Sequence, residues 1–212
     1  MSNPADLRRE YALAGLRRAD LSRDPIAQFA DWFQTAHREA IGEPNAMTLA
    51  TADSDGTPSA RTVLLKGFDE RGFCFYTNYW SQKGRELESN PRACLVFFWQ
   101  NLERQVVIRG GVERVSREET LAYFQSRPRG SQLGALVSAQ SEVIPNRAFL
   151  ESNLTRLETE FAETPITLPE HWGGFRVHPS SIEFWQGRPN RLHDRFRYTR
   201  TERNWQIDRL SP

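Results

Sequence analysis

The sequence predicts a mainly β protein in which an antiparallel barrel is surrounded by α-helices. Strand-like runs of apolar, β-branched and aromatic residues are concentrated toward both ends of the chain, and most helical patterns lie between them. Turn sequences such as "DSDG" and "DERG" separate neighbouring strands. The simplest closure pairs late strands with early ones and packs the helices outside the barrel.

The first element is predicted to be a helix at 24–42. Asp24 can cap its N-terminus, Pro25 suits its first turn, and Gly42 can end it. Apolar residues recur with helical spacing. They are Ile26, Phe29, Trp32, Phe33 and Ala36.

The other elements follow from alternation, turn residues and helix signals. The first three strands are expected to form an antiparallel meander, and Gly110 and Gly111 suggest a β-bulge in a later hairpin. Strands are predicted at 46–51, 58–68, 73–78, 92–99, 103–116, 174–178, 181–187, 191–199 and 204–209. Further helices are predicted at 81–90, 117–127, 146–163 and, as a short one, at 129–137.

The composition is that of a globular protein without a strong overall charge. The 212 residues have a mass of 24.5 kDa and include 26% charged and 38% apolar residues. Lys and Arg number 28 against 27 acidic residues, which gives a net charge of +1. No global field therefore favours nucleic acid or an anionic membrane, and any cationic cluster must be local.

The cysteines and the N-terminus indicate a cytoplasmic protein. Cys74 and Cys94 lie in apolar, strand-like runs without a ligand or partner at suitable spacing, so two buried free thiols are expected and no metal site. The first twenty residues lack the apolar stretch of a signal peptide. The longest apolar run, 93–99, is too short to span a membrane.

Several cationic residues have positions that suit phosphate binding. Arg61 and Lys66 stand at opposite ends of one predicted strand, on opposite faces if that strand is regular. Lys83 lies near a helix start, where backbone N–H groups favour an anion. Taken alone, each of these residues is better explained as a solvated surface charge.

Tyr123, Arg127 and Ser131 suggest a phosphate clasp at a helix junction. Tyr123 and Arg127 are four residues apart and share a helix face, and Pro128 separates them from Ser131 at the next helix. A Tyr packed on an Arg stem explains the first two equally well.

In "RLHDRF", Arg191, His193 and Arg195 alternate along a predicted strand and would share one face, where like charges repel unless a ligand lies opposite. Other polar or aromatic candidates, each also explained by surface polarity or packing, are Gln105, Gln140, Ser141 and Trp185.

The sequence has no P-loop, nucleophile elbow, dinucleotide fingerprint or closely spaced metal-ligand set. This pattern favours phosphorylated ligands, with the chemistry supplied by a cofactor.

Several stretches carry a family resemblance that runs in order from residue 7 to 212. They are "LRREY", "GLRRADL", "RTVLLKGFDERGFCFYTN", "LERQVVIRG", "YFQSRPRGSQLGALVSAQS", "WGGFRV", "EFWQG", "RLHDRF" and "WQIDRLSP". On these stretches the sequence resembles the pyridoxine/pyridoxamine 5′-phosphate oxidase family, flavin enzymes that make pyridoxal 5′-phosphate. A generic flavin-binding split barrel would not be expected to keep both "RLHDR" and the terminal "IDRL".

The resemblance implies an antiparallel split β-barrel that binds FMN, in a homodimer whose sites are built from both subunits. It implies a mobile N-terminal segment at 1–20 and a single domain at 21–212 that ends in dimerisation and substrate strands. The implied reaction oxidises pyridoxine 5′-phosphate or pyridoxamine 5′-phosphate with dioxygen as acceptor. Hydrogen peroxide is released, with ammonia from the amine.

The resemblance also implies the site residues. The FMN site would comprise Arg61, Thr62, Val63, Leu64, Leu65, Lys66, Tyr76, Thr77, Gln82, Lys83, Gln105, Gln140, Ser141, Trp185 and Arg195. The substrate site would comprise Arg8, Tyr11, Lys66, Tyr123, Arg127, Ser131, Arg191 and His193. Arg61 and Lys83 would hold the FMN phosphate, and Arg191 and His193 would orient the reacting carbon and assist proton movement.

The sequence departs from the family pattern at Gln82, where an Arg is often found beside the Lys, and at Leu136 and Ala139. Three rival functions follow from the same residues: a flavin reductase or other FMN oxidoreductase, a non-catalytic carrier of FMN or pyridoxal 5′-phosphate, and a nucleic-acid module. The near-neutral charge and the scattered tryptophans oppose the last.

Overall fold

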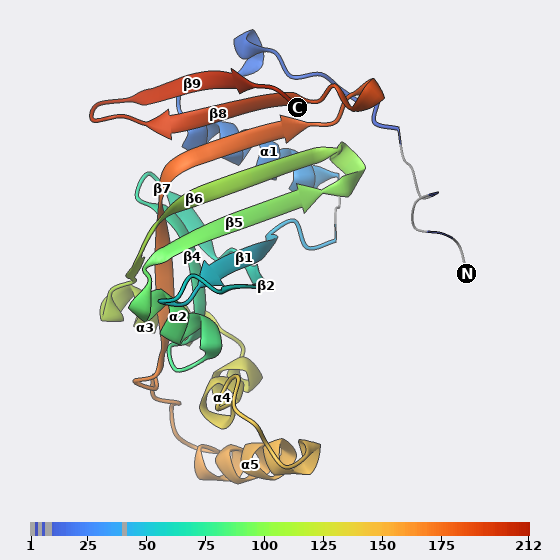
Figure 1. Cartoon of the computed structure of the whole chain (residues 1–212). Coiled ribbons are helices and arrows are strands. Elements are labelled where there is room, and N and C mark those ends of the chain that lie inside the picture. The colour runs from blue at the N-terminus through green and yellow to red at the C-terminus, as the bar shows by residue number, and fades with distance from the viewer. Residues whose placement is uncertain (1–2, 4–5, 7–9, 40–41) are drawn as a thin grey trace.

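The protein is a curled, nine-stranded antiparallel sheet with helices packed around it, as Figure 1 shows for the computed structural model. The structure describes residues 3, 6, 10–39 and 42–212, so Arg8 lies outside the described residues. The strands are β1 (Ala46–Ala52), β2 (Pro58–Leu64), β3 (Gly67–Asp69), β4 (Gly72–Asn78), β5 (Arg92–Trp99), β6 (Arg104–Arg114), β7 (Trp172–Gln186), β8 (Asp194–Arg200) and β9 (Trp205–Leu210). The α-helices are α1 (Pro25–Arg38), α2 (Gln82–Ser89), α3 (Arg117–Ser126), α4 (Arg129–Val137) and α5 (Arg147–Glu160).

The strand order β2-β1-β5-β6-β7-β4-β3, with β8 beside β7 and β9 beside β8, confirms that late strands pair with early ones. The predicted early meander is only partly correct, because β4 pairs with β7 rather than β2. The two strands predicted at 174–178 and 181–187 are one strand, β7. Conversely, the strand predicted at 58–68 is interrupted after Leu64 and resumes as β3.

The predicted β-bulge lies between Arg109 and Gly110, where the register of β6 against β7 shifts. Gly110 is required there, because a Cβ at this position would lie 1.9 Å from the carbonyl oxygen of His178. The bulge increases the bend of the sheet locally.

Helix α1 begins as predicted and ends early. The Asp24 carboxylate accepts hydrogen bonds from the N–H groups of Ile26 and Ala27 at 3.0 and 3.3 Å. The helix ends at Arg38 rather than Gly42, and its last buried residue is Ala36. Helix α4 has the predicted bounds, whereas α5 is shorter than 146–163: Asn146 is its N-cap, and the helix ends at Glu160 with Phe161 as its C-cap.

The main core lies between α1 and the sheet. Phe29 is fully buried and contacts the rings of Phe73 and Phe97 at centroid distances of 4.9 and 5.1 Å. A second, smaller cluster around Phe124 and Trp172 packs α3, α4 and α5 against the start of β7. Figure 1 shows α4 and α5 at one end of the molecule and the β8–β9 hairpin at the other.

Both cysteines are free, as predicted; Cys74 is buried and Cys94 is half-buried. Burial raises the pKa of each thiol, which makes both poor nucleophiles. Within the described ranges, no helix is both long and apolar enough to cross a bilayer.

We expect Phe29→Ala to lower the free energy of unfolding by ~3–5 kcal/mol, because it removes a fully buried ring from the centre of the aromatic core. Phe149→Ala, at a ring on α5 that is 45% exposed, should cost less than ~1 kcal/mol. Denaturant unfolding of both variants measures the difference, and equal losses would contradict the placement of the core.

Candidate functional site

One cavity of about 720 Å³ collects most of the predicted site residues. It lies between β2 and β4 on one side and α2, α3 and α4 on the other. Its predicted lining residues are Arg61, Thr62, Val63, Leu64, Lys66, Tyr76, Thr77, Lys83, Tyr123, Arg127, Ser131 and Gln140. Arg61 and Lys66 reach the same cavity. They were expected on opposite faces only if one regular strand ran through both, and β2 ends at Leu64.

Arg61 is anchored at one end of this cavity by a buried carboxylate. Its guanidinium donates to the Thr51 and Ser59 hydroxyls and to Glu86 Oε2, the last at 3.2 Å. Burial disfavours ionisation of Glu86, yet hydrogen bonds from Thr51, Ser59 and Gln82, together with the charge of Arg61, leave the pKa of Glu86 lowered overall. The Glu86 carboxylate therefore stays ionised and holds Arg61 in place.

Lys83 stands beside Arg61 without a carboxylate of its own among the described residues. Its side chain is buried, and Nζ donates to Gln140 Oε1 at 3.2 Å and to the Thr77 and Ser81 hydroxyls at 3.4 Å. Burial, and then the charge of Arg61, lowers the pKa of Lys83. Two cations therefore share one carboxylate at this end of the cavity, which leaves a local positive charge suited to an anion.

The start of α2 fixes Lys83. Ser81 caps the helix by accepting from the Gly84 N–H at 3.3 Å. Gly84 permits the close approach of Tyr79, whose carbonyl oxygen would lie 2.1 Å from an added Cβ. Any larger residue at 84 would displace the helix start from the cavity.

Six predicted cofactor residues do not line the cavity, and three of them are Leu65, Gln82 and Ser141. Gln82 turns its side-chain amide to Glu86 Oε1 at 2.9 Å, and its backbone N–H donates to the Ser141 hydroxyl at 3.2 Å. Both residues therefore lie at the start of α2, next to the cation pair. Leu65 is 5% exposed and packs in the main core.

The opposite end of the cavity is an anion clasp, by which we mean Lys66, Tyr123, Arg127 and Ser131. The Tyr123 ring stacks on Tyr76 at 4.0 Å, and the Arg127 guanidinium lies 4.6 Å from the Trp172 ring centroid. One terminal nitrogen of Arg127 is buried without a hydrogen-bond partner in the described part of the chain. Burial also lowers the pKa of Arg127. A buried donor without an acceptor is costly, so this atom indicates that the clasp takes a ligand.

A second group of predicted residues lies outside the cavity, on the far half of the sheet. The strand register places Gln105 opposite Trp185 and Trp185 opposite Arg195, so these three residues form one row across β6, β7 and β8. His193 packs on Trp185 with ring centroids 4.6 Å apart, and Tyr11 packs edge-on against Trp185 at 5.6 Å. Within one chain, the predicted site is therefore split in two.

The strand predicted at 191–199 begins only at Asp194, so Arg191, His193 and Arg195 do not share a strand face. Pro189 and Asn190 start a turn, and both Asn190 and Arg191 have positive φ values, of 57° and 61°. Proline lacks a ladder donor and asparagine tolerates the left-handed region, which favours a turn over a strand.

Arg195, the member of this trio that is in the strand, faces a protein carboxylate. Its Nε donates to Glu183 Oε1 at 2.8 Å, and Glu183 is 5% exposed. Sequence reasoning missed both Glu183 and Glu86. Glu86 could have been found as the residue four positions after Gln82 on α2, whereas Glu183 follows only from the register of β7 against β8.

The hydrogen bonding of His193 sets its tautomer. Its Nδ1 accepts from the Arg188 backbone N–H at 3.1 Å, so the neutral ring carries its proton on Nε2. Burial, and then the charge of Arg191, lowers the pKa of His193. His193 is therefore a neutral hydrogen-bond donor at Nε2 rather than a ready proton acceptor.

The segment around Tyr11 is attached to the same half of the sheet. The Leu13 N–H donates to Glu103 Oε2 and the Leu16 N–H to Asp194 Oδ2, each at 3.0 Å. The predicted role of Arg8 concerns a residue outside the described ones, and the predicted boundary at residue 20 stays a prediction.

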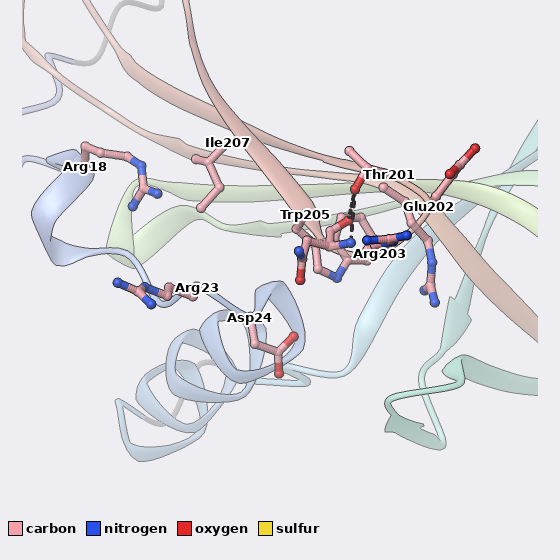
Figure 2. A pocket seen from close by; sticks show the side chains of 10 residues that line it. Arg18, Arg23, Asp24, Thr201, Glu202, Arg203, Trp205 and Ile207 are labelled. Carbon is pink, nitrogen blue, oxygen red and sulfur yellow. Dashed lines mark hydrogen bonds between the residues drawn. The ribbon is translucent and has the colours of Figure 1, made fainter.

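A separate cavity of about 670 Å³ contains none of the predicted site residues. Figure 2 shows Arg18 and Arg23 on one side and the hairpin residues Arg203 and Trp205 on the other. Its arginines are exposed to solvent, so they need no ligand to satisfy them. In the part of the chain described, no three His, Cys, Asp or Glu side chains are grouped to hold a metal ion.

Comparisons with known proteins give a consistent result. A family model described as pyridoxamine 5′-phosphate oxidase matches residues 33–161. A second, described as the pyridoxine 5′-phosphate oxidase C-terminal dimerisation region, matches residues 172–212. The protein named pyridoxine/pyridoxamine 5′-phosphate oxidase from Salinibacter ruber is 57% identical to this chain, and the match covers all of both chains. The protein of the same name from Rubrobacter xylanophilus is 58% identical, and the match covers 98% of this chain and 96% of that protein.

Among solved structures, PhzG from Burkholderia lata, in complex with tetrahydrophenazine-1-carboxylic acid, has a TM-score of 0.90 and 29% identity, covering 96% of this chain and all of PhzG. This likeness confirms the predicted split-barrel fold. A pyridoxamine 5′-phosphate oxidase-related, FMN-binding protein from Nostoc punctiforme has a TM-score of 0.71 at 18% identity, covering 91% of this chain and all of that protein. At that identity the likeness concerns the fold alone.

We expect His193 to titrate with a midpoint below 6.5, because burial and Arg191 oppose its protonation and a proton on Nδ1 would cost the hydrogen bond from Arg188. Since the unfolded chain then binds this proton at higher pH, the stability contributed by neutral His193 is complete above about 6.5 and falls as the pH drops below that value. NMR titration of the imidazole signals, with His193→Asn for assignment, measures the midpoint. A midpoint at or above 6.5 would contradict the described environment.

Proposed function

The chain belongs to the pyridoxamine 5′-phosphate oxidase family, and from this premise we propose that it oxidises pyridoxine 5′-phosphate and pyridoxamine 5′-phosphate to pyridoxal 5′-phosphate with FMN as cofactor. The observation that carries this proposal is a cavity with two incompletely neutralised cationic ends. Arg61 and Lys83 form one end, and Lys66 and Arg127 belong to the other. Two phosphorylated ligands in one cavity, cofactor and substrate, would satisfy both ends.

The side chains present fit FMN. A phosphate between Arg61 and Lys83 would give the buried ammonium the counter-charge that it lacks among the described residues. Thr77 and Gln140 offer polar atoms beside that point, and the segment from Thr62 to Leu64 provides an extended wall for a flat ring system. When bound, FMN supplies a two-electron acceptor that is reoxidised by dioxygen, with release of hydrogen peroxide.

The substrate phosphate would lie in the anion clasp. The Tyr123 hydroxyl is a donor on α3, and the Arg127 nitrogen that has no partner among the described residues is a donor just past the end of this helix. Lys66 adds charge from the segment between β2 and β3. Anchoring the substrate by its phosphate fixes the distance between ring and cofactor, which lowers the entropic cost of reaching the reactive geometry.

A second copy of the chain would complete the site. Gln105, Trp185, Arg191, His193 and Arg195 lie away from the cavity on the far half of the sheet. Four of these five residues, all but Gln105, fall in the stretch that matches the dimerisation region, residues 172–212. A homodimer that brings this group from one subunit to the cavity of the other would unite the two parts, with both sites built from both chains.

Within that dimer, Arg191 and His193 would face the reacting substituent of the substrate. His193 would donate from Nε2 to the substrate's oxygen or nitrogen, because its Nδ1 is already engaged. Arg191, exposed and without an ion-pair partner in the described residues, would hydrogen-bond to the same oxygen or nitrogen and favour the loss of its proton to water, which accompanies the departure of hydride from the exocyclic carbon. The alcohol substrate then gives the aldehyde, and the amine gives an imine that water hydrolyses with release of ammonia.

The test is an anaerobic spectrum of the FMN-loaded protein before and after addition of pyridoxine 5′-phosphate. Loss of the visible flavin absorption, formation of an aldehyde and recovery of colour in air are expected. A yellow protein that does not bleach with either phosphorylated substrate would refute the proposed substrates. It would favour a flavin reductase, if a nicotinamide cofactor bleaches it, or a carrier without turnover.

We expect Lys83→Met to raise the dissociation constant of FMN by about 10- to 100-fold, the effect of losing one charge-assisted hydrogen bond. The free energy of unfolding of the apoprotein should not fall, because the variant removes a buried cation without a carboxylate of its own. Flavin fluorescence titration and denaturant unfolding measure the two quantities. Arg156→Gln, an exposed charge on α5, is the control and should leave FMN affinity unchanged. Parallel loss of stability and affinity would mean that Lys83 is structural.

Arg191→Gln should reduce kcat by about a hundredfold or more while changing the dissociation constant of FMN less than about threefold. The reason is that Arg191 lies apart from the cation pair proposed to hold the FMN phosphate. Steady-state kinetics and flavin titration of the same preparation separate the two effects. Equal losses in turnover and FMN retention would count against the assignment.

A further inference from the structure

Four charged side chains form a closed ring of ion pairs between α3 and the sheet. Arg176 on β7 donates to Asp69 Oδ1 at 3.0 Å and to Glu119 Oε2 at 2.6 Å. Arg71 donates to Asp69 Oδ2 at 2.8 Å and to Glu119 Oε1 at 2.7 Å. Each carboxylate is thus shared by both guanidiniums. We call Asp69, Arg71, Glu119 and Arg176 the charge ring.

Arg176 is the buried member of the charge ring. Its side chain is 4% exposed, whereas those of Asp69, Glu119 and Arg71 are 32%, 39% and 54% exposed. A buried guanidinium depends on its carboxylates, because removal of one leaves a charge that neither protein nor water compensates. Hydrogen bonds from Arg71, with the charge of Arg176, lower the pKa of Glu119 despite some desolvation, so the ring is fully ionised near neutral pH.

The charge ring is connected to the anion clasp through α3. Glu119 and Tyr123 are four residues apart on this helix and share one side of it. Arg127 follows the last helical residue as the C-cap: its backbone is extended, and its N–H donates to the Phe124 carbonyl oxygen at 3.2 Å. Both Tyr123 and Arg127 line the cavity. Because Glu119 ties the start of α3 to the sheet, it contributes to fixing the rotation of Tyr123 and the position of the helix end at which Arg127 lies.

We propose that Arg176 is a positioning residue for the anion clasp and acts through Glu119. The inference rests on the proposed function only for the identity of the substrate. Arg176 touches neither the cavity nor a predicted ligand position. Its effect would be to hold Tyr123 and Arg127 where both reach the same phosphate.

The alternative is that other contacts of α3 fix the helix without the charge ring. Phe124 is fully buried, Arg117 donates to the carbonyl oxygens of Leu168 and Trp172 at 2.8 and 3.1 Å, and Tyr123 stacks on Tyr76. If these contacts alone fix the helix, loss of the charge ring will not change ligand affinity. The two possibilities therefore differ in a measurable quantity.

The test uses Glu119→Gln and Arg176→Lys in the FMN-loaded protein. Glu119→Gln keeps the side-chain shape but removes the charge, and Arg176→Lys keeps the charge but loses the fork that bridges two carboxylates. For each variant we expect KM for pyridoxine 5′-phosphate to rise about tenfold, with kcat and the FMN dissociation constant changed less than about twofold. Glu118→Gln is the matched control, since Glu118 lies on the same turn, is exposed and has no ion pair within the described ranges.

Inorganic phosphate provides a readout that a general loss of stability would not produce. Its inhibition constant against pyridoxine 5′-phosphate should rise in parallel with KM in Glu119→Gln and stay unchanged in Glu118→Gln. If Glu119→Gln does not fold, Arg71→Gln removes one partner of Glu119 from the exposed side of the ring and should shift KM in the same direction by a smaller factor. An unchanged KM, or an equal loss of kcat and FMN binding, would overturn the proposal.

Failure of the proposed function is distinguishable from failure of this inference. If the wild-type protein oxidises neither phosphorylated substrate, the proposed function fails. Calorimetric titration of inorganic phosphate into FMN-loaded wild type and Glu119→Gln then decides the inference. Weaker phosphate binding by the variant supports a positioning role for the charge ring, and equal binding or no binding by either protein overturns it.

Discussion

Strand β7 ties the cavity, the charge ring and the distal aromatic group to one continuous piece of backbone. Its first half pairs with β4 and its second half with β8, while β6 runs beside nearly all of it. Trp172 at its start lines the cavity, and Trp185 near its end packs on His193. At about 3.3 Å per residue these two tryptophans are about 43 Å apart along the strand. A strand hydrogen-bonded on both sides cannot fold back to bring its ends together. This is the physical reason why one chain holds the predicted site in two parts, and it is why the proposed function calls on a second chain to join them.

The cations that are withdrawn from solvent are of two kinds: those paired with a protein carboxylate, and those without such a partner among the described residues. Arg176 and Arg195 are each matched by protein carboxylates at 2.6–3.0 Å, so their charges are compensated within the chain. Lys83 and Arg127 are also withdrawn from solvent, yet neither has an ion pair among the described residues, and burial lowers the pKa of both. Keeping such groups charged costs stability in the absence of a ligand. An anion bound beside them would offset this cost, so under the proposed function the imbalance that destabilises the apoprotein would strengthen the binding of phosphorylated molecules.

Sequence patterns predicted the elements whose ends are marked by local chemistry. The start of α1 follows from Asp24 and Pro25, the end of β5 from its apolar run, and the bulge in β6 from Gly110. Patterns failed where pairing decides the outcome: β2 and β3 look like one strand, and Arg191 looks like part of β8.

The site was predicted largely through the family resemblance, which identified residues from distant segments that share the cavity. Glu86, Glu183 and the charge ring were missed, because a counter-charge across a sheet or between a helix and a sheet depends on register and on tertiary packing. Register and tertiary packing leave no pattern at a fixed spacing in the sequence.

The likeness to PhzG shows that fold alone does not choose the substrate. The extended wall along β2 is a surface against which different flat ring systems can lie. The discriminating feature is the far end of the cavity. There, a guanidinium nitrogen of Arg127 is buried without a hydrogen-bond acceptor among the described residues, a desolvation cost that the protein bears before any ligand binds. Under the proposed function, the phosphate of the substrate would remove that cost, and an analogue that offers no acceptor there would not. Since Arg127 is the C-cap of α3 and the proposed role of Arg176 is to fix α3 through Glu119, selectivity for phosphate would depend on a charge ring that lies outside the cavity.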